Sequence, residues 1–183
     1  MSETAAGPRP AESTAPEPVA RMIRVDHAGE YGAKRIYQGQ LAVLGRRPVA
    51  PVLRHMQDQE QVHLDTFADL IGRRRVRPTA LLPLWHLAGF ALGAATAALG
   101  ERAAMACTVA VEETIDEHYA RQTAELGEDE TALRETIETF RAEEVEHRDI
   151  GLAHEAELAP GYRLLSRVIK AGCRAAIAIS ERV

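Results

Sequence analysis

The chain of 183 residues is long enough to form one domain with a sizeable hydrophobic core. Its composition, 46% apolar and 27% charged residues, is that of an ordinary globular protein, and abundant Ala, Leu, Glu and Arg favour an all-α fold. The formal net charge of −5 argues against a nucleic-acid-binding protein, and two distant cysteines make neither a disulfide framework nor a zinc site.

The first 18 residues are rich in Pro, Ala and Glu and contain no apolar run. Such a segment cannot bury enough apolar surface to fold, so we expect a disordered tail over residues 1–18 and one domain over residues 19–183. The tail has neither the apolar stretch of a secretory signal nor the Arg-rich, acid-poor composition of a transit peptide. We therefore expect a cytoplasmic location in a bacterium.

The first predicted helix spans about residues 19–44, where apolar residues recur with a roughly helical period. Glu30 lies in its middle, close to Gly29 and Gly32. Each glycine costs helix stability, up to about 1 kcal/mol relative to alanine. Two glycines beside one carboxylate therefore indicate that another helix or a ligand comes close to this part of the chain.

The second predicted helix spans about residues 49–71 and contains Glu60 and His63. A Glu and a His three residues apart lie one turn apart on the same face of a helix, where they can bind one metal ion. The basic run RRRVR over residues 73–77 follows the helix. In an acidic protein this short run favours a solvated turn over contact with anionic lipid or nucleic acid.

Residues 79–100 contain no Asp, Glu, Lys or Arg. As a helix they would nearly match a bilayer core of about 30 Å, so a transmembrane span is the first alternative. A span would, however, separate the Glu-x-x-His motif from a second copy that occurs later in the chain. Ferritin-like bundles have one long crossover between their halves. We therefore expect a crossover helix along the bundle, whose outer face contacts a membrane surface.

The third predicted helix spans about residues 101–126 and contains a single candidate ligand, Glu112. Tyr119 lies seven residues later, so it falls on the same face of the helix. We expect Tyr119 either to position a substrate or a proton near the metal site, as a catalytic residue, or to pack in the core.

The fourth predicted helix spans about residues 129–158 and carries the second Glu-x-x-His motif, Glu144 and His147. The segment 163–183 follows, with an apolar stripe on one side and Arg or Lys on the other. A basic amphipathic helix fits a membrane surface, and packing against the bundle is an equally good interpretation.

The chain therefore contains the pattern Glu…Glu-x-x-His twice, and the two glutamates of each copy are 30 and 32 positions apart. Four-helix bundles with two-metal carboxylate sites use this set of residues, one Glu from each of two helices and one Glu-x-x-His from each of the others. Mixed carboxylate and imidazole ligands suit iron or manganese. The predicted ligands are Glu30, Glu60, His63, Glu112, Glu144 and His147.

Three neighbouring side chains are weaker candidates for roles around the metals. His27 is three residues before Glu30 and could support it, although a solvated histidine is the better interpretation. Asp26 could hold the free ring N–H of a ligand histidine, and Asp149 lies off the ligand-bearing face.

Six stretches of the sequence resemble the demethoxyubiquinone hydroxylase family of ubiquinone biosynthesis, over about residues 20–183. In that family the six matching residues would be di-iron ligands, with Glu60 and Glu144 as bridges. The stretches are RVDHAGEYGAKRIYQGQ, DQEQVHLDTF, RVRPTALLPLWHLAGFALGA, MACTVAVEETIDEHY, FRAEEVEHRDIGLAHEAELAP and AGCRAAIAISER.

The resemblance implies insertion of one oxygen atom from O₂ into the ring of a polyprenylated quinone precursor, the penultimate step of the pathway. It also implies two Fe ions per chain, NADH as a possible reductant, and in some organisms a lipid-binding accessory protein. A substrate with a long isoprenoid tail lies in the bilayer, so segments 79–100 and 163–183 are the expected membrane-facing surface. The competing hypotheses are a ferritin-like iron-storage protein and a rubrerythrin-type peroxidase, which usually has an additional Cys-rich iron site.

Overall fold

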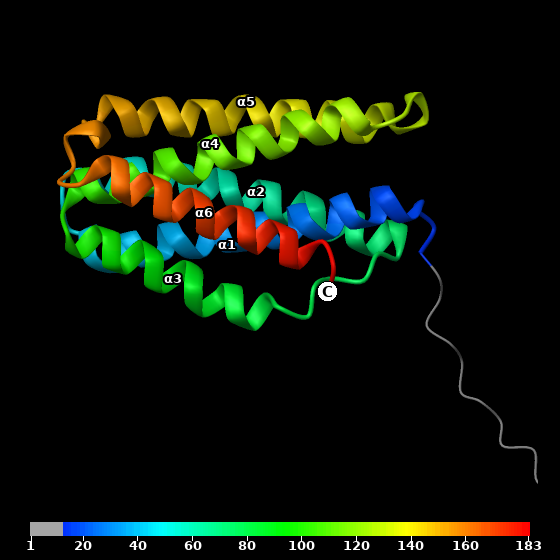
Figure 1. The fold of residues 1–183 in the computed structure, drawn as a ribbon, viewed down its shortest axis with the longest axis horizontal. Helices are drawn as coiled ribbons and strands as arrows, with labels where there is room; N and C mark the ends of the chain where they lie inside the picture. Colours follow the sequence, from blue (N-terminus) through cyan, green and yellow to red (C-terminus); the bar gives the residue numbers. More distant parts are fainter. Residues whose placement is uncertain (1–12) are drawn as a thin grey trace, which may run out of the picture.

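The computed structural model describes residues 13–183, and within that range the chain forms six α-helices, two short 3-10 helices and no strand (Figure 1). The predicted all-α class is therefore confirmed. Most of the expected tail, residues 1–12, lies outside the described residues. The elements are α1 (Glu17–Leu44), α2 (Ala50–Arg74), α3 (Leu82–Ala98), α4 (Glu101–Glu125), η1 (Glu128–Glu130), α5 (Thr131–Ala153), η2 (Ala156–Leu158) and α6 (Tyr162–Ser180).

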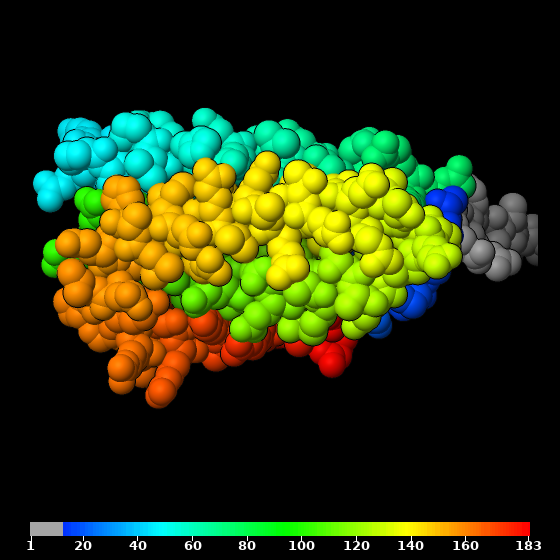
Figure 2. Space-filling view, turned by 90° about the horizontal axis from the view of Figure 1, so that it is seen from above, coloured from blue at the N-terminus to red at the C-terminus, as the bar shows by residue number. Residues whose placement is uncertain are grey.

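All six helices run roughly along the long axis of the molecule (Figure 1), and their contacts divide them into two similar halves. In the first half α1 packs against α2 and α3, and in the second half α4 packs against α5 and α6. Helices α1, α2, α4 and α5 make a ferritin-like four-helix bundle, with α3 and α6 added against α1 and α4. Figure 2 shows α5 between α2 and α4 on one face, with side chains closely packed along its length.

The apolar segment 79–100 forms helix α3, which lies along α1. Close contact depends on glycine: a Cβ on Gly93 would overlap the carbonyl group of Ile36, and one on Gly89 would lie 2.8 Å from the carbonyl oxygen of Gly32. Within residues 13–183 no helix combines the length and the hydropathy that crossing a membrane requires.

The fourth predicted helix is shorter than expected. Helix α5 ends at Ala153, and Glu155 adopts the left-handed conformation with φ 60°. This conformation breaks the helix before the predicted end at residue 158. Glu155 forms an ion pair at 2.5 Å with Arg102, and this pair connects the turn after α5 to the start of α4.

Two apolar clusters enclose the middle of the bundle. One contains Ile23, Phe67 and Ile137, and the other contains Leu53 and Met105. Burial of such side chains removes apolar surface from water and stabilises each helix in its place. The polar residues between the two clusters are therefore buried away from bulk solvent.

Candidate metal centre

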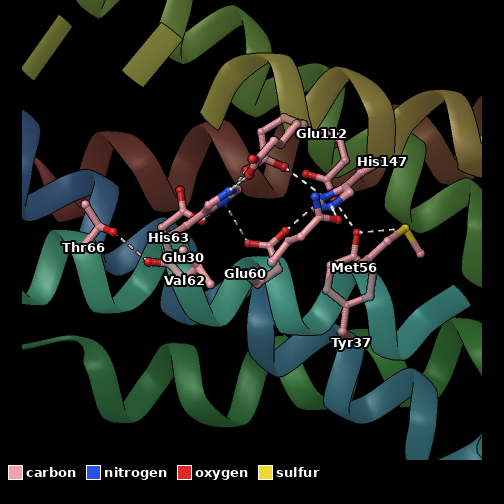
Figure 3. Close-up of polar contacts among 12 residues, drawn as sticks. Glu30, Tyr37, Met56, Glu60, Val62, His63, Thr66, Glu112 and His147 are labelled. Atoms are coloured by element: carbon pink, nitrogen blue, oxygen red, sulfur yellow. Dashed lines mark hydrogen bonds and ion pairs between the residues drawn. The ribbon is translucent and has the colours of Figure 1, made fainter. Parts of the chain in front are cut away.

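The six predicted ligands come together in the middle of the bundle (Figure 3). Helices α1 and α4 each contribute one glutamate, and α2 and α5 each contribute a Glu-x-x-His pair. None of the six is more than 1% exposed to solvent. They are Glu30, Glu60, His63, Glu112, Glu144 and His147.

Potential ligand atoms form two overlapping groups, in each of which the atoms lie within 4.8 Å of one another. Both groups contain Glu60 and Glu144, because these two carboxylates lie between the others. The first group is completed by Glu30 and His63, and the second by Glu112 and His147. This arrangement matches two cations that share two carboxylates.

Both histidines turn the same ring nitrogen towards the centre. His63 Nδ1 lies 3.1 Å from Glu144 Oε1 and 3.4 Å from Glu30 Oε2. His147 Nδ1 lies 3.3 Å from Glu60 Oε1 and 3.3 Å from Glu144 Oε2.

Several buried polar atoms at the centre have no hydrogen-bond partner among the described residues. Both carboxylate oxygens of Glu60 and of Glu144, and Nδ1 of both histidines, belong to this set, as do one oxygen each of Glu30 and Glu112. Burial of polar atoms without partners is costly, and buried groups are normally satisfied. Converging oxygen and nitrogen atoms of this kind are the donor set that iron or manganese binds, so the residues fit a pair of such ions.

The pKa values of the centre show how strongly like charges compete there. Burial raises the pKa of Glu60 and of Glu112 well above the usual value, and the charge of Glu144 raises them further. Burial alone would lower the pKa of His63, but the carboxylates of Glu144 and Glu30 outweigh it and raise this pKa to about 12. The centre therefore binds protons strongly, and bound cations would have to displace them.

Two tyrosines donate hydrogen bonds to the single glutamates across the bundle. Tyr119 on α4 donates to Glu30 Oε1, and Tyr37 on α1 donates to Glu112 Oε1 at 2.7 Å. Only Tyr119 was predicted to lie near the site. Tyr37 could have been found from the sequence, because each tyrosine lies seven residues after the glutamate of its own helix.

The outer nitrogen of each histidine has a hydrogen-bond partner that the sequence pattern does not indicate. His63 Nε2 donates to Glu143 Oε2 at 2.5 Å, and His147 Nε2 donates to Gln59 Oε1 at 3.0 Å. Each partner comes from the other Glu-x-x-His helix, immediately before its glutamate.

The weaker candidates lie elsewhere. Asp26, which the sequence suggested as a partner of a ligand histidine, instead accepts a hydrogen bond at 2.7 Å from Gln122 and lies 3.3 Å from His118. His27 is half-buried, and Asp149 pairs with Arg148 at the surface.

An apolar cavity of about 400 Å³ lies on the side of α1 and α4 that faces away from α2 and α5, and α3 and α6 form its other walls. Val111 and Ile115 line it on either side of Glu112 along α4. Trp85 on α3 donates a hydrogen bond to Ser180 on α6 at 3.1 Å, which joins the two outer walls.

Three glycines keep the cavity open. Gly29, Gly32 and Gly172 line it, and a Cβ added at any of them would meet no atom within 4 Å. Side chains at these positions would therefore project into empty space. The cavity has the size and apolar lining of a site for a small hydrophobic molecule.

A four-helix bundle with this buried cluster places the protein in the class of ferritin-like carboxylate proteins. Residues 17–180 match the family described as Ubiquinone biosynthesis protein COQ7, and the chain belongs to this family. The resemblance seen in the sequence is thus confirmed.

Relatives from bacteria, animals and fungi carry names of hydroxylases. The chain is 63% identical to the 3-demethoxyubiquinol 3-hydroxylase of Rhodospirillum rubrum, over 92% of this chain and 81% of that protein. It is 59% identical to the human NADPH-dependent 3-demethoxyubiquinone 3-hydroxylase, over 90% and 78% respectively. It is 43% identical to the 5-demethoxyubiquinone hydroxylase of Saccharomyces cerevisiae, over 89% and 77%.

Proposed function

We propose that the protein is an O₂-dependent monooxygenase that hydroxylates the ring of a polyprenylated demethoxyubiquinol, the penultimate step of ubiquinone biosynthesis. The observation that carries this proposal is the buried carboxylate–histidine cluster beside an apolar cavity, in a chain whose relatives are named as hydroxylases of this substrate. An iron-storage protein has no need of such a cavity.

The metal proposal follows the two groups of ligand atoms. Glu60 and Glu144 would bridge two iron ions, with Glu30 and His63 completing one position. Glu112 and His147 would complete the other. When bound, the ions would supply the electrons and the Lewis acidity that activation of O₂ requires.

We propose that Tyr119 acts at the centre by holding a proton at Glu30. Burial and the charge of Glu30 raise the pKa of Tyr119 well above its usual value, so the phenol stays protonated and donates to this carboxylate. A fixed donor here keeps one oxygen of Glu30 engaged and leaves the other facing the centre.

The apolar cavity would receive the quinol ring and the first part of its isoprenoid tail. Its walls at Val111 and Ile115 bring an apolar ligand next to Glu112 without exposing the centre to bulk water. In the reaction one oxygen atom of O₂ replaces a ring hydrogen as hydroxyl, and the other leaves as water with two protons and two electrons. NADH is the proposed source of those electrons, and the human relative is named for NADPH.

If the protein lies at the cytoplasmic surface of the cell membrane as a peripheral protein, the lipid substrate could enter the cavity directly from the bilayer. Segments 79–100 and 163–183 form its outer walls and expose large apolar side chains, such as Leu87 at 70% and Leu164 at 69%. A lipid-binding accessory protein could deliver the substrate at the same surface.

The charges of α6 divide into two sets. Lys170 and Arg174 pair with Glu113 and Glu117 of α4, at 2.6 and 3.0 Å, so they hold α6 against the bundle. Arg163 and Arg167 are exposed and belong to no ion pair within residues 13–183. These two arginines are the candidates for contact with anionic headgroups.

The first test is a turnover assay with iron-loaded protein, a short-chain demethoxyubiquinone, NADH and ¹⁸O₂, read by mass spectrometry. We expect a product that contains one labelled oxygen atom. Oxygen consumption by iron-loaded protein without a labelled quinone would contradict the proposed function and favour an iron oxidase.

A further inference from the structure

The two halves of the metal centre have matching geometry and different chemistry. Each histidine donates its outer N–H to the residue that precedes the glutamate on the facing helix. For His63 this residue is Glu143, and for His147 it is Gln59. One histidine therefore has a carboxylate as its partner, and the other has a neutral amide.

This difference matters because the ring orientation fixes which nitrogen carries the proton. Nδ1 of both histidines faces the centre, so Nε2 must donate outwards when a metal is bound at Nδ1. A carboxylate acceptor makes a shorter, charge-assisted hydrogen bond than an amide does, in line with 2.5 Å for His63 and 3.0 Å for His147. Such a partner raises the basicity of the imidazole as a ligand.

A second pair of contacts shows the same bias. Gln122 donates to Asp26 Oδ1 at 2.7 Å, four residues before Glu30, and Gln40 donates to Thr108 Oγ1 at 3.4 Å, four residues before Glu112. Asp26 and Thr108 thus occupy matching places in the two halves, an acid in one and a hydroxyl in the other. Both differences place an acid in the half of the centre that contains Glu30 and His63, although Asp26 also has His118 as a neighbour at 3.3 Å.

We infer that Glu143 is a positioning residue that makes the metal position at Glu30 and His63 the tighter of two unequal positions, so that two metal ions bind in separate steps. This inference rests on the proposed two-metal centre and goes beyond the hydroxylase reaction itself. Glu143 does not belong to either group of ligand atoms, and it acts through His63.

The test is an anaerobic titration of metal-free protein with Fe²⁺, in which isothermal titration calorimetry measures binding. Neither substrate nor O₂ is present. The wild-type protein should bind two ions in two resolved steps. Glu143→Gln keeps a hydrogen-bond acceptor and removes the charge, so it should weaken the first step by about 10- to 100-fold, the usual effect of changing the partner of a ligand histidine. Gln59→Glu should strengthen the second step.

Glu146→Gln is the matched control, because Glu146 is an exposed acid on the same helix, beside His147 in sequence, without a hydrogen bond to either ligand histidine. This variant should bind both ions as the wild type does. Mössbauer spectra of protein loaded with one equivalent of ⁵⁷Fe²⁺ give a second readout. The wild type should show one dominant quadrupole doublet, and Glu143→Gln should show two comparable ones.

Wild-type affinities in Glu143→Gln, or an equal loss in Glu146→Gln, would overturn the inference. Thermal unfolding of the metal-free variants checks that each is folded, and Glu143, whose side chain is 35% exposed, should tolerate the change. The proposed function can fail independently of this inference. If Fe²⁺ binds in two steps with the expected shift in Glu143→Gln, but the turnover assay yields no labelled quinone, the two metal positions are unequal and the hydroxylase function is wrong.

Discussion

The candidate metal centre has different surroundings on its two sides. One side faces α2 and α5, and the other faces α1 and α4. On the first side, polar and aromatic contacts fix the ligands: His63 stacks on Phe140 with ring centroids 4.0 Å apart, and its outer nitrogen is bound to Glu143. On the second side, each helix gives one glutamate and then a wall of small and apolar residues around a cavity.

The difference indicates a division of labour between the two sides. The helices with Glu-x-x-His motifs hold the candidate ligands in place through specific partners on the facing helix. Helices with a single glutamate leave room beside them, which requires glycine and alanine. The candidate metal centre and the apolar cavity can then lie on different sides of α1 and α4 without competing for the same surface.

The largest effect should come from removing a shared ligand. Glu144→Ala takes away a carboxylate that belongs to both groups of ligand atoms, so turnover should fall below detection and bound iron should fall from two ions to fewer than one per chain. The measurement is iron content by mass spectrometry together with the turnover assay. Glu138→Ala, an exposed acid on the same helix, should keep both, and normal turnover in Glu144→Ala would contradict the ligand assignment.

The cavity side can be tested by filling it. Gly32→Leu places a side chain in empty space, so kcat/KM for the quinone should fall by about 10- to 100-fold through misplacement of the substrate, while iron content stays unchanged. The same change should stabilise α1 by up to about 1 kcal/mol, because leucine is a better helix former than glycine.

Gly72→Leu is the control for this prediction. Gly72 also has open space at its Cβ position, but it lies at the exposed end of α2, away from the cavity. If both variants lose activity equally, the cavity is not where the substrate binds.

The six candidate ligands could be grouped from the sequence because each follows the period of its own helix, and the structure brings all six together. Glu60 and His63 share a face whatever α2 packs against, and the repetition of the pattern identified the four helices. The helical period also places Tyr119 on the same face as Glu112. The glycines near Glu30 indicate, from the sequence alone, the approach of a helix or a ligand; in the structure no atom lies within 4 Å of a Cβ added at either one, and both line the cavity.

The partners of the ligands could not be predicted in the same way, since they depend on the register between helices. Gln59 and Glu143 bind histidines on facing helices, and Tyr37 binds a glutamate on α4. The cavity depends likewise on how far α3 and α6 stand from the bundle. The early end of α5 reflects Glu155 in the left-handed conformation, for which the sequence gives no glycine signal.

A smaller effect is expected at the outer surface of the cavity side. Arg163→Gln should weaken binding to vesicles with anionic lipid by about 5-fold, since one basic residue near the surface contributes about 1 kcal/mol. Co-sedimentation with vesicles of phosphatidylglycerol and phosphatidylcholine measures this, and turnover of a short-chain substrate in detergent should stay the same.

Lys170→Gln is the matched variant for that test, because Lys170 is engaged with Glu113. It should weaken vesicle binding less than Arg163→Gln does. The reverse order, or no vesicle binding by the wild type, would argue against α6 as the membrane-facing helix.

The smallest expected effect is a change in the melting temperature of the metal-free protein with pH, which arises from the titratable groups of the candidate metal centre. The pKa values of Glu60 and Glu112 are raised in the folded protein, and that of His63 is raised to about 12, so the folded chain binds more protons than the unfolded chain between pH 6 and 8. Stability from a raised pKa is present at low pH and is lost as the pH rises. The pKa of Glu144, lowered to about 2, changes protonation only below this range.

Metal-free protein should therefore melt a few degrees higher at pH 6 than at pH 8, since a change of about 1 kcal/mol moves the melting temperature of a chain of this size by about 2–4 °C. Iron-loaded protein should show the opposite trend, because protons compete with the metal for the same atoms. Differential scanning calorimetry with and without a chelator measures both trends. If the melting temperatures of the two forms change with pH in the same direction, the ions do not replace these protons. That result would contradict the assignment of Glu60, Glu112 and His63 as metal ligands.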